Sequence, residues 1–292
     1  MQLARILDRV YLRVGGLTIH VSSAELPWPI VPAPAASRFL VEPSTADVEI
    51  DVHARRCDVP GGPCLFESGG PWRLYRHAGG YRFVFVANRS ADPYKIADFN
   101  PEFSDGVVTI HEPFFAGVSS IDPLEYPLDE LLIVSRLGRG LGVELHGCGV
   151  LDGSDGHLFV GQSGAGKTTT ARLWLDVDGA VVLSDDRVIV RAEEGGLWMY
   201  GTPWHGDEPL ASPRRARLTN VFLLRQLDRH ALAPLSAAAA IARLFAASFP
   251  AFHDRAALAF TLAFLERIAA SVPVRELGFT PGRSLIDFVR SA

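Results

Sequence analysis

The feature that most constrains this chain is the octapeptide Gly161-Gln-Ser-Gly-Ala-Gly-Lys-Thr168. It matches G-x-x-x-x-G-K-[ST], the pattern of phosphate-binding P-loops. The apolar run before it, residues 157–160, predicts a strand, and residues 168–174 predict the first turns of a helix. The pattern alone arises by chance in about 1% of chains of this length. Because strand and helix also flank it in the required order, we expect a nucleotide-binding α/β element here.

The residue types in this motif suit a triphosphate. Gly164 and Gly166 lack a Cβ, so backbone N–H groups can close around phosphate oxygens. The predicted helix begins where the phosphates would lie, with its positive end toward them. Lys167 supplies a cation for the β and γ oxygens, and the Thr168 hydroxyl is placed to ligate Mg²⁺. The residues predicted to bind ATP are Gly161, Ser163, Gly164, Ala165, Gly166, Lys167, Thr168 and Thr169.

Two carboxylates follow the next predicted strand. Residues 180–183 form an apolar run that ends in Ser184-Asp185-Asp186-Arg187, a Walker-B-type arrangement. Such a strand delivers its carboxylates to the edge of the sheet where ligands of α/β proteins bind. Asp186 has an alternative role as the cap of the following turn. His146 lies in a predicted strand before the P-loop, and a structural hydrogen bond is its alternative role.

The loop Gly201-Thr-Pro-Trp-His-Gly-Asp207 is rich in reactive groups and poor in core-forming residues. We therefore count Arg187, His205 and Asp207 as candidate substrate contacts. For His205 and Asp207, stabilisation of their own loop is an equal alternative.

The chain of 292 residues predicts two domains, a strand-rich N-terminal domain (1–120) and a nucleotide-binding domain (121–292). The first contains two hairpins, around Gly15-Gly16 and Gly79-Gly80, and predicts a small antiparallel β domain. In the second, helical and strand-like patterns alternate, which predicts a mixed sheet with flanking helices. The fold class expected for the whole chain is α+β, with an α/β nucleotide-binding part.

Charge and composition argue against several classes of partner. The net charge of −5 does not favour nucleic-acid binding. No signal peptide and no run of 18 or more apolar residues is seen, so we expect a cytoplasmic protein without membrane association. The oligomeric state stays open.

Three motifs in order resemble the HPr kinase/phosphorylase family. They are His146-Gly147, the P-loop, and Ser184-Asp-Asp-Arg-Val188, and the resemblance covers roughly residues 142–192. It implies a nucleotide fold similar to that of ATP-dependent phosphoenolpyruvate carboxykinase. It also implies that Asp185 is the general base for a seryl hydroxyl, that Asp186 helps hold Mg²⁺, and that His146 orients the carboxylates. Lys167 would bind the transferred phosphate, which suits a reaction based on positioning, a metal and a proton acceptor.

The chain departs from the bifunctional members of that family. Their Arg-Gly-Leu-Gly type signature follows the Asp-Asp strand, whereas Arg139-Gly-Leu-Gly142 lies upstream of the P-loop here. The chain is more similar to related kinases of peptide-modification systems. We therefore expect an ATP- and Mg²⁺-dependent kinase acting on a hydroxyl of a peptide or protein, without phosphorylase activity. The alternatives are a nucleotide-binding regulatory module and a small-molecule kinase.

Overall fold

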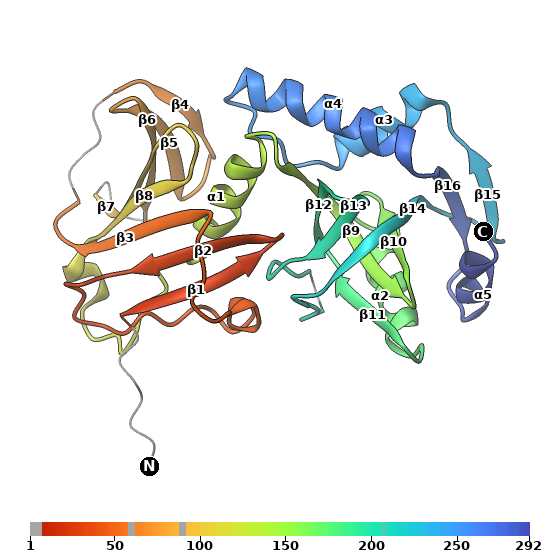
Figure 1. The fold of residues 1–292 in the computed structure, drawn as a ribbon, viewed down its shortest axis with the longest axis horizontal. Coiled ribbons are helices and arrows are strands. Elements are labelled where there is room, and N and C mark those ends of the chain that lie inside the picture. The colour runs from red at the N-terminus through yellow and green to blue at the C-terminus, as the bar shows by residue number, and fades with distance from the viewer. Residues whose placement is uncertain (1–7, 58–61, 88–91, 207) are drawn as a thin grey trace, which may run out of the picture. The chain divides into compact units, whose positions relative to one another are not determined.

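The computed structural model describes residues 8–57, 62–87, 92–206 and 208–292. The chain forms two compact units (Figure 1): unit 1 is Met1–Arg13 with Leu17–Arg136, and unit 2 is Val14–Gly16 with Leu137–Ala292. The described residues form a mixed α+β fold with two large mixed sheets and five α-helices. In these same residues, no helix is both long enough and apolar enough to cross a membrane.

Unit 1 is built on one sheet. Its eight described strands lie in the order β1-β2-β3-β8-β7-β6-β5-β4. The strands are β1 (Arg9–Val14), β2 (Leu17–Ser22), β3 (Val48–Ala54), β4 (Cys64–Glu67), β5 (Trp72–His77), β6 (Gly80–Val86), β7 (Pro93–Phe99) and β8 (Asp105–Ile110). Two short 3-10 helices, η1 (Ala36–Phe39) and η2 (Glu112–Phe115), and one α-helix, α1 (Leu128–Leu137), complete the unit.

The prediction that this first sheet is antiparallel is wrong. β3 pairs in parallel with β2 on one side and with β8 on the other. Parallel neighbours need a long connection, and residues 23–47 provide one between β2 and β3. The alternation within β3 places Val48, Ile50 and Val52 inside and Glu49 and Asp51 outside, as one buried face requires.

Unit 2 contains the predicted phosphate-binding motif. Its strands are β9 (Gly142–Asp152), β10 (Asp155–Val160), β11 (Ala180–Ser184), β12 (Arg187–Glu193), β13 (Gly196–Gly201), β14 (Arg215–Gln226), β15 (Ala231–Pro234) and β16 (Val274–Phe279). Its helices are α2 (Lys167–Leu175), α3 (Ala237–Ala246), α4 (Arg255–Ser271) and α5 (Ser284–Arg290). The strands follow the order β10-β9-β12-β13-β14-β16-β15, and β11 pairs with β9.

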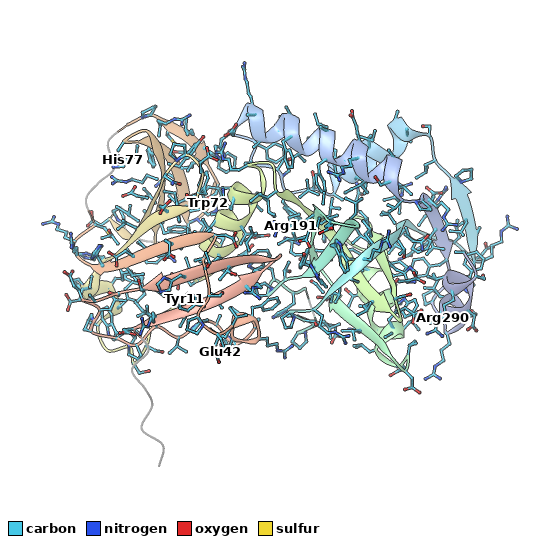
Figure 2. The ribbon with its side chains drawn as sticks, viewed as in Figure 1. Tyr11, Glu42, Trp72, His77, Arg191 and Arg290 are labelled. Atoms are coloured by element: carbon cyan, nitrogen blue, oxygen red, sulfur yellow. The ribbon has the colours of Figure 1, made fainter. Side chains whose placement is uncertain are left out.

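Helices pack on both faces of the second sheet. Along β10, Leu158 and Val160 belong to one buried cluster, which includes residues of α3 and α4. Phe159, which points the other way, belongs to a second cluster with residues of α2 and α5. Arg290 at the end of α5 (Figure 2) pairs with Asp152 of β9 at 2.8 Å. The two-sided core explains why β10 is a continuous apolar run.

The motif follows the carboxyl end of β10, which pairs in parallel with β14. The pairing aligns Val160, the last residue of β10, with Leu223 of β14. The chain then leaves the sheet, passes through residues 161–166 and enters α2. The predicted strand and helix that flank the motif are therefore present.

Candidate functional site

The glycine-rich loop, residues 161–166, has the backbone that its sequence requires. Gly164 and Gly166 have φ values of 80° and 106°, in the left-handed region that favours glycine. A Cβ on Gly166 would lie 2.4 Å from the ring of Phe279. Among the described residues, no side chain caps the N-terminus of α2. Its first N–H groups therefore remain available to an anion.

Lys167, the first residue of α2, folds back over this loop. Its Nζ donates to the carbonyl oxygens of Gly161 at 2.9 Å and Gln162 at 3.3 Å. The side chain is buried, and burial lowers the pKa of Lys167 while the Asp186 carboxylate opposes the shift. An ammonium has three donors, so one remains for a phosphate oxygen. Thr168 and Thr169 follow in the first turn of α2, and Ser163 and Ala165 lie within the loop.

Asp186 is paired with the side chains of His146 and Arg187. Its Oδ1 lies 2.9 Å from Nε2 of His146, and its Oδ2 accepts from Arg187. The register of β9 and β12, which aligns His146 with Arg187, produces this arrangement. Burial by itself would raise the pKa of Asp186, but the His146 hydrogen bond and the nearby cations lower it below its ordinary value. Asp186 is therefore held ionised.

Asp185 lies in a different environment. The residue is 1% exposed, and its Oδ1 accepts from the Gly206 amide at 3.0 Å. Its Oδ2 is buried and has no hydrogen-bond partner among the described residues. Burial raises the pKa of Asp185, and the amides of Gly206 and Glu208 oppose the shift. An unpaired buried carboxylate oxygen is costly, and this cost is larger for the ionised form.

The segment Gly201–Gly206 packs beside the two carboxylates. The Thr202 hydroxyl donates to the Arg187 carbonyl at 2.7 Å, and the Ser184 hydroxyl donates to the Trp204 carbonyl at 3.5 Å. Beyond the segment, Glu208 binds Arg172 of α2. These contacts hold the segment against the site.

Two candidate substrate contacts, His205 and Asp207, belong to this loop. His205 is exposed, and its Nδ1 lies 3.0 Å from the Gly206 carbonyl oxygen, the local role that was its alternative. Asp207 lies outside the described residues.

A pocket of about 440 Å³ lies beside the glycine-rich loop. It is lined by Gly161–Ala165, by His146, and by Arg243, Ala246 and Ala247 from α3 and its end. Sequence reasoning missed Arg243 because α3 shows only an ordinary amphipathic pattern. Gly206 was missed as a partner of Asp185 for a similar reason, since the contact joins positions that are 21 residues apart.

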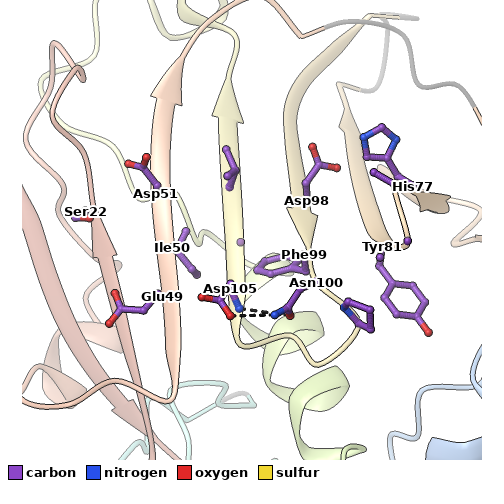
Figure 3. Close-up of a pocket in the computed structure, with 16 residues that line it drawn as sticks. Ser22, Glu49, Ile50, Asp51, His77, Tyr81, Asp98, Phe99, Asn100 and Asp105 are labelled. Atoms are coloured by element: carbon purple, nitrogen blue, oxygen red, sulfur yellow. Dashed lines mark hydrogen bonds between the residues drawn. The ribbon is translucent and has the colours of Figure 1, made fainter.

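A larger pocket of about 710 Å³ lies in unit 1 (Figure 3). Its lining includes four carboxylates, Glu49, Asp51, Asp98 and Asp105, and Asp105 accepts from Asn100 at 2.9 Å. Negative charge of this kind repels a triphosphate. We therefore place the candidate nucleotide site at the smaller pocket, which adjoins backbone donors and Lys167.

Across the described ranges, no group of three or more His, Cys, Asp or Glu side chains is placed to hold a metal ion. Comparison of the chain with models of known protein families and with curated proteins found no match.

Proposed function

We propose that this chain is an ATP- and Mg²⁺-dependent kinase that transfers the γ-phosphate to a hydroxyl, in the first instance a serine of a peptide or protein. The observation that carries the proposal is Asp185. One of its oxygens is fixed by the Gly206 amide, and the other is buried without a partner. A module that only binds nucleotide has no need for such a carboxylate beside its glycine-rich loop.

In this proposal the loop and Lys167 bind the phosphates, and Asp185 accepts the proton of the acceptor hydroxyl. The hydroxyl oxygen forms a bond to the γ-phosphorus, the bond to the β–γ bridging oxygen breaks, and ADP leaves. A raised pKa makes Asp185 a stronger base than an exposed aspartate. The buried oxygen Oδ2 is the atom that would take the proton.

The oxygen donors suit Mg²⁺. This ion prefers one or two carboxylates with substrate phosphates and water, so it does not need a cluster of protein ligands. Asp186, held ionised by His146 and Arg187, and the Thr168 hydroxyl would hold it. When bound, the ion would neutralise charge on the phosphate oxygens.

The resemblance of residues 142–192 to HPr kinase/phosphorylase supports the same assignment. The His-Gly pair and the Asp-Asp pair are far apart in sequence, on either side of the P-loop motif, yet direct contacts join these two pairs. His146 bonds Asp186, and the Gly147 amide donates to the Asp186 carbonyl at 3.0 Å. The charge of Asp186 in turn acts on the ammonium of Lys167.

The test compares Asp185→Asn with Asp186→Asn. Asp185→Asn keeps the size of the side chain but removes the base, so transfer should fall by roughly 10²–10⁴-fold while ATP binding changes little. Asp186→Asn should instead raise the Mg²⁺ concentration that half-maximal transfer requires. The measurements are calorimetric titration with ATP and transfer of labelled phosphate to serine peptides and to small alcohols. Asp176→Asn, a change at a well-exposed carboxylate of unit 2, is the matched control.

The outcomes separate the alternatives. Transfer by Asp185→Asn at the parental rate would remove the general base from the mechanism. A parent that binds ATP but phosphorylates no peptide or alcohol would favour the regulatory module. Transfer to small alcohols alone would favour a small-molecule kinase.

A further inference from the structure

Arg243 faces the same pocket as the glycine-rich loop. It lies on α3, and together with Ala246 and Ala247 it lines the cavity that Gly161–Ala165 also line. Positions three and four apart on a helix share one face, so this face carries one cation, Arg243, followed one turn later by two small residues at the end of α3. The alanines leave room around the guanidinium for a ligand.

Two arginines share one carboxylate beside this pocket. Glu276 of β16 accepts from Arg243 at 2.6 Å and from Arg225 at 3.2 Å. One carboxylate cannot neutralise two guanidiniums, so this group carries excess positive charge. Of the two arginines, Arg243 lines the pocket, and its side chain is 37% exposed against 62% for Arg225.

We propose that Arg243 is a further nucleotide-binding residue of this site and that it contacts the terminal phosphate of the triphosphate. The inference rests on the proposed function, because it takes the ligand of the pocket to be ATP. A guanidinium has five donors in a planar fork that matches phosphate oxygens. Glu276 accepts from one terminal nitrogen of Arg243, Nη1, and the other donors remain for a ligand.

The position of the pocket favours the terminal phosphate over the others. The pocket is lined by the first five residues of the motif and by His146, the partner of Asp186. Lys167 and the first turn of α2 do not line it among the described residues, so Arg243 would reach the transferred phosphate from a different side than Lys167. A cation at this end would bind the phosphate that is transferred and would stabilise the charge that develops on it.

The alternative is that Arg243 only stabilises the fold through Glu276. Partly exposed ion pairs contribute little to stability, and Arg225 also contacts this carboxylate, at 3.2 Å. A structural role therefore predicts that substitution of either arginine leaves nucleotide affinity unchanged. A phosphate-binding role predicts that they differ.

The experiment uses Arg243→Ala, Arg243→Gln and the matched control Arg225→Ala. Each variant and the parent is titrated with Mg²⁺-ADP and with the Mg²⁺ complex of the non-hydrolysable β,γ-imido analogue of ATP. Arg243→Gln keeps most of the aliphatic stem, so it tests the charge even if Arg243→Ala folds poorly. Thermal unfolding of all variants checks the fold.

We expect both Arg243 variants to lose at least tenfold in affinity for the triphosphate analogue, with ADP affinity within twofold of the parent. Arg225→Ala should bind both nucleotides like the parent. Where the parent transfers phosphate, the Arg243 variants should lose transfer by on the order of 10²–10³-fold.

Equal losses for ADP and the analogue, or equal behaviour of the Arg243 and Arg225 variants, would overturn the inference. The binding data judge it separately from catalysis. A parent that binds the analogue but transfers nothing contradicts the proposed function and leaves the Arg243 result standing. If the parent transfers phosphate and the Arg243 variants bind and react normally, only the inference about Arg243 is contradicted. If the parent binds neither nucleotide, both the proposed function and the inference are contradicted.

Discussion

At the scale of single residues, the surroundings of Asp185 and Asp186 set the direction in which the pKa of each is shifted. Asp185 and Asp186 are adjacent in sequence, yet burial raises the pKa of the first, while His146 and cations lower that of the second despite burial. Two carboxylates with opposite shifts can divide the work of proton acceptor and metal ligand. The sequence does not predict these opposite pKa shifts, because they come from partners on β9 and on the segment 201–206.

His157 supplies a prediction about stability. It is 4% exposed, packs against Phe159, Trp174 and Phe222, and its Nδ1 has no partner among the described residues. Burial lowers the pKa of His157, so below about pH 6.5 the unfolded chain binds a proton that the folded chain does not. Folding stability should therefore fall as the pH falls below about 6.5, by at most about 1.4 kcal/mol per pH unit from this residue.

The measurement is denaturant unfolding at several pH values between neutral and mildly acidic, on the parent and on His157→Gln. The variant cannot titrate at this position, so its stability should depend less steeply on pH. Identical slopes for the two proteins would mean that His157 does not contribute.

At the scale of elements, the segment Gly201–Gly206 controls the position of Asp185. A Cβ on Gly206 would lie 3.0 Å from Oδ2 of Asp185, and Gly206 also donates the amide that fixes Oδ1. Gly206→Ala should therefore displace the proposed base and lower the transfer rate, by up to about 10²-fold. Thermal unfolding of the variant checks that the fold is retained.

The matched control is Gly282→Ala, where a Cβ would meet only the Ser284 hydroxyl at an ordinary 3.8 Å. The rate of phosphate transfer and the ATP affinity are measured for both variants. A Gly206→Ala protein with parental transfer would show that the segment does not position Asp185.

Local sequence patterns predicted most of the helices and strands, but not how the strands pair in the sheets. The hairpin around Gly79-Gly80 was expected, and it is present with β5 and β6 antiparallel. The strands β4, β7 and β15 were not expected. β15 is short and ends in proline, and β7 begins with one, so these segments carry weak strand signals.

What the sequence could not supply is the set of long-range contacts. The parallel partners of β3 depend on which strands lie beside it in the sheet, and hydrophobic alternation is the same for either direction of pairing. The glycine-rich loop, Asp185, Asp186 and His146 became candidates because each belongs to a sequence motif. Arg243 and Glu276 belong to none, and only the packing of α3 beside β16 brings them together.

At the scale of the whole molecule, the proposed kinase activity can be tested for its direction. The family that residues 142–192 resemble includes phosphorylases, which use inorganic phosphate to remove the phosphate from a seryl group. That reaction forms a bond between inorganic phosphate and the seryl phosphorus, breaks the seryl C–O–P linkage at phosphorus, and returns a proton to the serine oxygen. It thus requires a second phosphate to be held beside the first, a task for residues beyond those of the forward reaction.

We expect this chain to lack the reverse activity. The signature of the bifunctional enzymes is missing from its expected place, and the segment Gly201–Gly206 packs there, with its amide on Asp185. A peptide phosphorylated by the enzyme itself is incubated with inorganic phosphate, Mg²⁺ and fresh enzyme, and pyrophosphate is measured against an enzyme-free sample. The forward reaction with ATP on the same preparation shows that the enzyme is active. Rapid formation of pyrophosphate would mean that the chain retains phosphorylase chemistry without that signature, and the site would then need a second phosphate subsite.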